Sequence, residues 1–189
     1  MRNIRYMTLQ NFAHGLLQLL GLLPLVQEPA AAHTEEPPAH RPLLRTPRAT
    51  LFLDFDGVLH SGNSGTFALL PSLEEVLREY SEIDIVLSTS WRTAEVKYLQ
   101  HLFDDDIASR VIGVTPHFDG QWARGREIMD IVSRYGIQQW VVLDDDKRLF
   151  SPDFPNVIFT DFRTGLTPAR LKELAERFEF WRQEQSEAV

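Results

Sequence analysis

The segment TLFLDFDGVLH, residues 50–60, joins a short apolar run to two carboxylates and a glycine. The apolar run has the length and composition of a buried strand. Asp54 and Asp56 follow it two positions apart, which gives both the same facing, and Gly57 can turn the chain. We expect a metal or phosphate site there, with an Asp-Gly hairpin turn or a calcium loop as alternatives. The calcium loop is disfavoured because its twelfth position, usually acidic, is Gly65.

Strands and helices are predicted to alternate along most of the chain. Apolar runs typical of buried strands occur at residues 49–53, 83–87, 111–115, 140–143 and 156–160. Apolar residues at helical spacing predict helices at residues 72–80, 93–103, 126–135 and from 168 onward. Strands and helices that alternate in this way are joined by right-handed crossovers. The sequence therefore predicts an α/β, Rossmann-like fold: a doubly wound parallel sheet of about five strands with helices on both faces.

Three of the expected helices carry end signals. Ser72 and Glu75 have the spacing of a capping box at the start of the first helix. Gly136 is expected to end the third helix. Thr167 is expected to cap the last one, with Pro168 at its first position.

The composition is that of an ordinary globular protein. The chain has 189 residues, of which 43% are hydrophobic and 24% charged, so we expect one domain with a packed core. The absence of cysteine excludes disulfides, zinc–thiolate sites, iron–sulfur clusters and thiol nucleophiles. The net charge of −8 argues against stable nonspecific binding to nucleic acid, although a local basic pocket remains compatible with it.

Residues 1–26 imitate parts of a secretory signal. Arg2 and Arg5 precede the leucine-rich run 15–26, and the small residues 30–32 follow it. This run has 12 residues, short of the ~20 that cross a bilayer. We expect an amphipathic helix or an unstructured leader, no transmembrane segment and a cytoplasmic protein, with export as the alternative if the leader is a signal peptide.

A domain boundary is predicted near Arg48. Residues 1–48 contain five arginines and three glutamates, a net charge of +2, whereas the rest of the chain is strongly acidic. The proline-rich residues 27–48 offer little to bury and predict a disordered linker. The folded domain is expected at residues 49–183, followed by a tail at 184–189.

Two hydroxyls follow the predicted strand 83–87, and two arginines open a later helix. Thr89 and Ser90 stand at the end of the strand and the start of a helix, where backbone N–H groups suit a phosphate. Arg124 and Arg126 open the third helix. We expect these four residues to bind phosphate, since ligands of such sheets lie beyond the carboxyl ends of the strands. A simple helix cap and solvated arginines are the alternatives.

Acidic residues also follow the strand 140–143. Asp144 and Asp145 belong to a triple carboxylate that would repel the Asp54 pair unless a cation were present. Acid at two neighbouring strand ends therefore predicts a metal site. Asp104–Asp106 follows a helix instead, and we expect a solvated turn there.

The order of these carboxylates, hydroxyls and cations along the chain resembles the motif pattern of the haloacid dehalogenase-like (HAD) phosphohydrolase superfamily. The resemblance covers about residues 50–178. The shared pattern is Asp-x-Asp-Gly-Val, a hydroxyl after the second strand, a cation that opens a helix, and Asp-Asp after the next strand. More narrowly, segments 87–92, 124–128 and 165–167 are similar to the small, uncapped bacterial HAD domains of Swiss Army Knife RNA repair proteins. The superfamily cation is most often lysine, whereas here Arg124 takes its place, with Arg126 and Lys147 as substitutes.

The resemblance implies a magnesium-dependent phosphatase. Asp54 would be both a metal ligand and the nucleophile that forms an aspartyl-phosphate. Asp56 would carry the proton to and from the reacting oxygens, and its backbone carbonyl would bind the metal. Asp145 would complete the protein ligands of Mg²⁺, with Asp144 beside it as a ligand or a support.

No cap domain is expected over the site. The segments 57–70 and 104–123 have 14 and 20 residues, below the ~40 at which an unstapled domain becomes able to fold. An open site favours a phosphorylated macromolecule, and the resemblance places an RNA end slightly ahead of a phosphoprotein. The other hypotheses are a noncatalytic phosphate-binding or regulatory module and a phosphotransferase.

Overall fold

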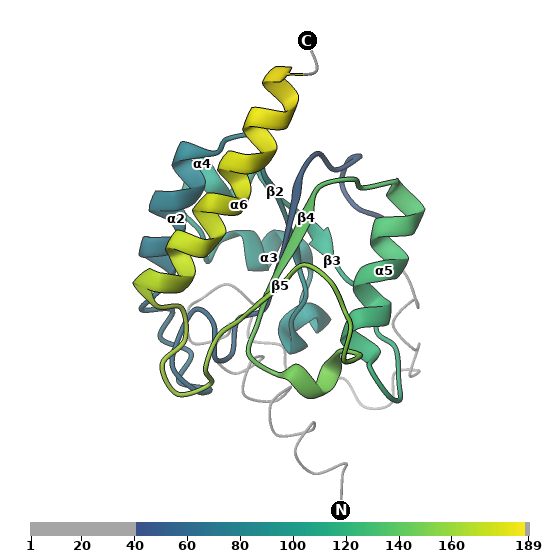
Figure 1. Ribbon diagram of the computed structural model, residues 1–189. Helices are drawn as coiled ribbons and strands as arrows, with labels where there is room; N and C mark the ends of the chain where they lie inside the picture. Colours follow the sequence, from purple (N-terminus) through teal and green to yellow (C-terminus); the bar gives the residue numbers. More distant parts are fainter. Residues whose placement is uncertain (1–40, 188–189) are drawn as a thin grey trace, which may run out of the picture.

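The computed structural model describes residues 41–187, which form a parallel sheet covered by helices (Figure 1). The strands are β1 (Thr50–Leu53), β2 (Asp84–Leu87), β3 (Val111–Val114), β4 (Trp140–Asp144) and β5 (Val157–Phe159). Their order in the sheet is β3-β2-β1-β4-β5, and every neighbouring pair is parallel. All five strands that the sequence predicts are confirmed, and so is the α/β class.

Helices cover both faces of the sheet. The α-helices are α2 (Leu70–Glu79), α3 (Val96–Gln100), α4 (Asp105–Ala108), α5 (Ala123–Tyr135) and α6 (Pro168–Glu187), with short 3-10 turns η1 (Ser90–Thr93) and η2 (Lys147–Leu149). Figure 1 shows α2, α4 and α6 on one side of the strands and α5 on the other. The sheet is therefore doubly wound, as expected, and the described chain has no inserted cap domain.

The central strand β1 separates two apolar cores. Leu51 and Leu53 pack with residues of α2 and α6, whereas Phe52 points to the opposite face and packs with Ile128 and Ile131 of α5. All four residues of β1 are buried. Burial on both faces explains why the strand reads as an unbroken apolar run.

The capping box expected at Ser72 and Glu75 is wrong. Helix α2 begins at Leu70, so Ser72 already lies inside its first turn, and Leu69 at the N-cap makes no side-chain cap bond. Pro71 explains the earlier start, because its fixed φ and missing N–H are tolerated in the first turn of a helix.

Two other helices differ in their extent. The helix expected at 93–103 is reduced to the short α3, because η1 ends at Thr93 and Ala94 and Glu95 are extended. The third helix begins at Ala123, three residues before the expected start. The end signals at Gly136 and Thr167 are confirmed: Gly136 has a φ of +63°, and Arg170 N–H donates to Thr167 Oγ1 at 3.4 Å.

The acidic run 104–106 lies at the start of α4. Asp104 is its N-cap, and the exposed carboxylates of Asp104 and Asp106 bind Arg78 of α2, at 2.5 and 2.7 Å. The run is thus solvated, as expected, but it also ties two helices together.

Residues 41–48, expected as the end of a linker, pack on the domain. Leu43 is buried in the core on the α5 face, and Leu44 N–H donates to the carbonyl of Ile112 in the edge strand β3. Arg45 and Arg48 bind the buried carboxylate of Asp84 at the start of β2. The folded unit therefore begins before the expected boundary at Arg48.

The structure describes little of the expected leader and linker, and most of the expected tail. Helix α6 continues through Glu187, into the residues expected as a tail. The leader 1–26 and most of the linker lie outside the described residues. Among the described helices, none is long and apolar enough to cross a membrane.

Candidate active site

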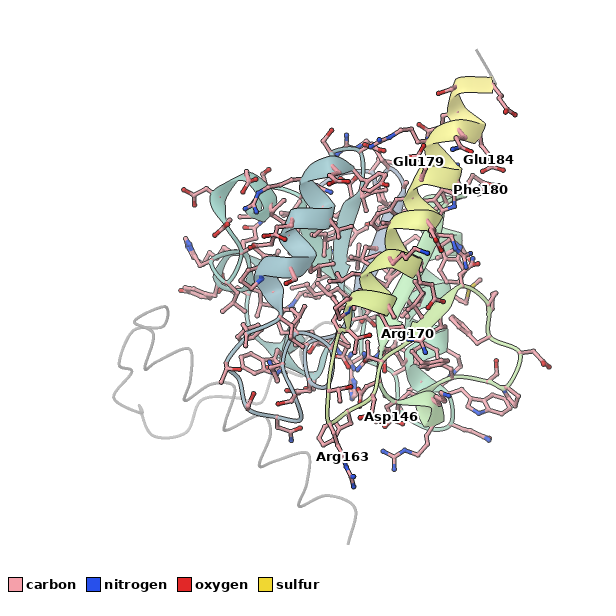
Figure 2. All side chains as sticks on the ribbon, turned by 60° about the vertical axis from the view of Figure 1, so that its left-hand side comes forward. Asp146, Arg163, Arg170, Glu179, Phe180 and Glu184 are labelled. Carbon is pink, nitrogen blue, oxygen red and sulfur yellow. The ribbon has the colours of Figure 1, made fainter. Side chains whose placement is uncertain are left out.

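Three aspartates converge at the carboxyl edge of the sheet. Asp54 follows β1, Asp144 ends β4 and Asp145 comes next, and the two strands are neighbours with Leu53 opposite Leu143. One carboxylate oxygen from each aspartate lies within 4.8 Å of the others. Asp146, the next residue, is at the end of the molecule where α6 starts near Arg170 (Figure 2). The cluster therefore lies where a doubly wound sheet binds its ligands.

Gly57 makes room for the third carboxylate. Its φ is +67°, and a Cβ built on it would lie 2.6 Å from Cγ of Asp145. Thr160 Oγ1 holds this turn by donating to the carbonyl of Gly57 at 2.7 Å. Both the backbone conformation and the close approach therefore require glycine beside the cluster.

Arg124 places a buried positive charge among these carboxylates. Its Nη1 donates to Asp144 Oδ2 at 2.7 Å and lies 3.4 Å from Asp54 Oδ2, and it also donates to the carbonyl of Ser88. The side chain reaches the cluster because α5 starts at Ala123, which puts Arg124 in its first turn. Arginine thus occupies the position at which the sequence predicts the site's cation.

The electrostatics of the site call for further positive charge. Burial raises the pKa of Asp54 and of Asp144, even though Arg124 lowers both. Burial, together with the charges of Asp54 and Asp146, raises the pKa of Asp145 to about 6. Crowded carboxylates of this kind are stabilised by a cation, and their oxygens suit a hard divalent ion.

Both carboxylate oxygens of Asp144 already accept hydrogen bonds from the protein. Asp144 is fully buried, its Oδ2 accepts from Arg124, and its Oδ1 accepts from the backbone N–H of Asp146 at 2.8 Å. Asp54 and Asp145 are therefore the better candidates to hold a metal. Asp144 serves to orient Arg124 and the turn after β4.

Thr89 lies against the cluster. Its hydroxyl donates to the carboxylate of Asp54, which favours the ionised carboxylate, and its Oγ1 also accepts the backbone N–H of Trp91 at 3.4 Å. The two interpretations of Thr89, site residue and helix cap, therefore apply together. Ser90 points elsewhere: its Oγ lies 3.4 Å from Oδ2 of Asp56.

The side chain of Asp56 lies outside the aspartate cluster. Its Oδ1 is 2.9 Å from Nε2 of His60, and its Oδ2 is 3.3 Å from Nε1 of Trp91. Its charge still acts on the nearby Asp54, whose pKa it raises. Sequence reasoning assigned no role to His60 or to the Trp91 ring; the only signal was the position of His60, four residues after Asp56.

Arg126 and Lys147 form no ion pair with the three aspartates within the described residues. The exposed guanidinium of Arg126 donates to the carbonyl of Asp119 and lies 5.7 Å from the centre of the Phe118 ring. Nζ of Lys147 lies 5.4 Å from the centre of the Phe159 ring. Neither residue takes the place that Arg124 occupies.

Glu127 is a buried acidic residue that sequence reasoning missed. Its Oε1 accepts from Arg92 and from the backbone N–H of Phe118, both at 2.9 Å. Its Oε2 lies 3.8 Å from Nε of Arg124, one helical turn earlier. The signal was an acidic residue three positions after the key arginine. Glu127 thus joins η1, the loop before α5 and the site arginine.

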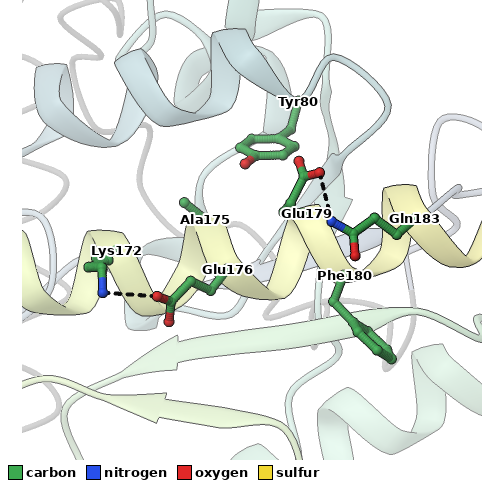
Figure 3. A pocket seen from close by; sticks show the side chains of 7 residues that line it. All are labelled: Tyr80, Lys172, Ala175, Glu176, Glu179, Phe180 and Gln183. Atoms are coloured by element: carbon green, nitrogen blue, oxygen red, sulfur yellow. Dashed lines mark hydrogen bonds and ion pairs between the residues drawn. The ribbon is translucent and has the colours of Figure 1, made fainter.

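A second surface feature lies away from these residues. A shallow hollow along α6 is drawn in Figure 3, and it is lined by Tyr80, Lys172, Ala175, Glu176, Glu179, Phe180 and Gln183. Lys172 pairs with Glu176, and Gln183 donates to Glu179. None of the expected site residues lines this hollow.

Comparison with known proteins agrees with the geometry. Residues 50–171 match the family model for the HAD domain in Swiss Army Knife RNA repair proteins. No curated protein and no solved structure shows a significant match to the chain. The matched range covers more than half of the chain and includes the whole sheet, Asp54, Thr89, Arg124 and Asp145. The match supports a phosphohydrolase at the level of the superfamily, and the chain belongs to this family of HAD domains.

Proposed function

We propose that the protein is a magnesium-dependent phosphatase that acts through an aspartyl-phosphate on Asp54. The observation that carries the proposal is the convergence of Asp54 and Asp145 within 4.8 Å, beside the buried guanidinium of Arg124. A carboxylate that serves as nucleophile, a second one that serves as metal ligand and a fixed cation are the groups that phosphoryl transfer requires.

The residues present fit a magnesium ion. Asp54 and Asp145 would supply carboxylate oxygens, and the resemblance adds the backbone carbonyl of Asp56. Magnesium takes few carboxylates and keeps several waters, which agrees with the commitment of Asp144 to Arg124. When bound, Mg²⁺ supplies the positive charge that offsets repulsion between Asp54 and the incoming phosphoryl group.

In the first step, an oxygen of Asp54 attacks phosphorus, and the bond from phosphorus to the leaving oxygen breaks. Asp56 gives its proton to that leaving oxygen. In the second step, water attacks the phosphorus of the aspartyl-phosphate and passes a proton back to Asp56. Phosphate leaves, and both aspartates return to their starting states.

Arg124 and Thr89 would bind the phosphoryl oxygens. Arg124 lies 3.4 Å from Asp54, so a phosphoryl group on that carboxylate would come within reach of the guanidinium. Thr89 offers a hydroxyl at the same carboxylate. Ser90 and Arg126 were also expected to bind phosphate. They contact Asp56 and Asp119 instead, so we assign them no contact with the phosphoryl oxygens.

The substrate we favour is a phosphorylated macromolecule, with an RNA end slightly ahead of a phosphoprotein. The absence of an inserted domain in the described chain supports an open site, which a large substrate can enter and cover. The matched family occurs in RNA repair proteins, whereas the net charge of −8 opposes extended contact with RNA. The comparison to make is kcat/KM for phosphorylated oligonucleotides, phosphopeptides and small phosphomonoesters. Hydrolysis of a small metabolite several orders of magnitude faster than either polymer would contradict this choice.

The mechanism is tested with Asp54→Asn, assayed on p-nitrophenyl phosphate with Mg²⁺. We expect turnover to be abolished while circular dichroism remains unchanged, because the amide cannot act as the nucleophile. Asp153→Asn changes an exposed aspartate in the same chemical way and should retain full activity. Activity in Asp54→Asn would rule out the covalent intermediate. A wild-type protein inactive on every phosphomonoester would indicate a noncatalytic module.

A further inference from the structure

The carboxylate of Asp56 is held by a buried histidine. His60 is fully buried, and its Nε2 lies 2.9 Å from Oδ1 of Asp56. The backbones of the two residues also form an isolated parallel bridge. Side chain and backbone together therefore fix His60 relative to Asp56.

The hydrogen of the imidazole is assigned by the surroundings of its second nitrogen. Nδ1 of His60 is buried and finds no hydrogen-bond partner within residues 41–187. A hydrogen on Nδ1 would be a buried donor without an acceptor, and it would leave Nε2 without a hydrogen to give to a carboxylate. The hydrogen therefore sits on Nε2, and His60 donates it to Oδ1 of Asp56.

An aromatic cluster holds the imidazole ring in place. The ring of Phe67 packs edge-on against His60, with 5.1 Å between ring centres, and against Phe55 and Trp91, both at 5.4 Å. Phe67 has a φ of +51°, in the left-handed region that a phenylalanine rarely adopts. Such strain persists only where the surroundings determine the conformation strongly. The cluster therefore restricts rotation of the histidine.

The two oxygens of Asp56 are held unequally. Oδ1 has the short contact with His60, at 2.9 Å. Within residues 41–187, Oδ2 has only two longer contacts, 3.3 Å to Nε1 of Trp91 and 3.4 Å to Oγ of Ser90. Contacts beyond about 3.2 Å are weak hydrogen bonds. Oδ1 is thus anchored, whereas the weaker contacts of Oδ2 can be exchanged for contacts with the reacting oxygens.

We propose that His60 is a positioning residue that anchors Oδ1 of Asp56 so that Oδ2 carries the transferable proton. This inference rests on the proposed function. In the first step the Oδ2–H bond breaks and an O–H bond forms on the leaving oxygen. In the second step Oδ2 takes a proton from the attacking water. His60 keeps its own hydrogen in both steps.

The inference is tested with two substrates that differ in their need for a proton. The p-nitrophenolate of p-nitrophenyl phosphate leaves readily without one, whereas the alkoxide of glycerol 2-phosphate must be protonated. Proton transfer by a positioned side chain contributes about 10² to 10⁴ in rate. We therefore expect His60→Leu to lower kcat/KM on glycerol 2-phosphate by about 10²-fold or more. On p-nitrophenyl phosphate we expect kcat/KM to fall less than about tenfold. The ratio kcat/KM is compared because it covers the steps up to release of the leaving group, whereas kcat also includes hydrolysis of the aspartyl-phosphate, which both substrates share.

A pair of amide variants separates positioning from packing. The amide nitrogen of Gln can reach the place of Nε2, whereas that of Asn reaches only the place of Nδ1. His60→Gln should restore activity on glycerol 2-phosphate, and His60→Asn should not. The pair also decides the question if His60→Leu does not fold. His101→Leu, at an exposed histidine, should leave the ratio of the two activities unchanged.

The outcomes separate this inference from the proposed function. Equal losses of kcat/KM on both substrates, or no loss on either, would overturn the role of His60 in an enzyme that is otherwise active. Equal activity of the Gln and Asn variants would do the same. A wild-type protein that hydrolyses neither ester would overturn the proposed function, and the inference with it.

Discussion

The replacement Arg124→Met tests whether the buried guanidinium balances the acidic site. Methionine has a similar length but no charge, so the variant leaves three carboxylates without their shared cation: Asp144 at 2.7 Å, Asp54 at 3.4 Å and Glu127 at 3.8 Å. Removing one partner of a buried ion pair costs about 3–5 kcal/mol. Arg124 is 6% exposed, so solvent screens little of this cost. We expect the free energy of unfolding to fall by about 3–5 kcal/mol at pH 7 in EDTA.

The deficit of Arg124→Met should depend on pH. Burial raises the pKa of Asp54 and Asp144 in the folded protein, and Arg124 opposes this rise. Without the guanidinium both pKa values should rise further. A carboxyl group whose folded pKa lies above its unfolded pKa binds its proton more tightly in the folded state, so the variant gains stability as the pH falls. The deficit should therefore be smaller at pH 5 than at pH 7.

The measurement is urea unfolding of both proteins at the two pH values. Arg134→Met is the control, because Arg134 lies on the same helix, is 42% exposed and pairs with Asp130. Its loss should be at most about 1 kcal/mol. Millimolar Mg²⁺ should restore part of the stability of Arg124→Met at pH 7, because the ion binds only the folded state. A loss below about 1 kcal/mol at pH 7, or a deficit independent of pH, would refute the balance of charges inferred here.

Two further predictions concern the metal site and the start of β2. Gly57→Ala should weaken Mg²⁺ binding by about tenfold or more in a thermal-shift titration, because the new Cβ would displace Asp145. An unchanged titration curve would contradict this. At Asp84, burial raises the pKa, but hydrogen bonds from Arg45 and Arg48 outweigh it and hold the pKa below its usual value. The stability from Asp84 is then present above about pH 4 and lost as the pH falls through the folded pKa, so Asp84→Asn should destabilise the protein more at pH 7 than at pH 3. Urea unfolding measures the difference in free energy of unfolding between Asp84→Asn and the wild type. An equal difference at both pH values would show that these ion pairs do not cause the loss of stability.

The sheet and the aspartate cluster could be predicted because they follow from local chemistry. Each strand is buried on both faces, so it appears in the sequence as an apolar run, as in Leu51, Phe52 and Leu53. Parallel strands end at the same edge, so carboxylates that follow two neighbouring strands must come together. The approach of Asp145 to Asp54 therefore needed no tertiary information beyond the strand order.

Helix starts were harder to predict, and one of them decided the choice between two arginines. With α5 beginning at Ala123, Arg124 lies in its first turn and faces the aspartates. Arg126 lies two residues later, about 200° around the helix, and points away to Asp119. Both arginines could not face the same site from one helix. The sequence pattern placed Arg124 first but also expected Arg126 at the phosphate, because the helix start was placed three residues too late.

The contacts of His60 and Glu127 are between polar side chains, which explains why the sequence did not reveal them. His60 meets Asp56 only because the turn at Gly57 folds the chain back on itself. Glu127 of α5 meets Arg92 of η1 across 35 positions of the chain. Apolar periodicity locates strands and helices but carries no information on which polar side chains meet between them.

The arginine at a position where the superfamily usually has lysine is explained by the acceptors around it. Nη1 of Arg124 contacts Asp144, Asp54 and the carbonyl of Ser88, while Nε faces Glu127 on another side. A lysine ammonium carries all its donors on one atom, whereas a guanidinium spreads five donors over a planar fork. Only the fork can contact the carboxylates of both strand ends and also face the glutamate of its own helix. Arg124 and the buried Glu127 are therefore linked features: Oε2 of Glu127, 3.8 Å from Nε, places a negative charge on the side of the guanidinium that a lysine would not present.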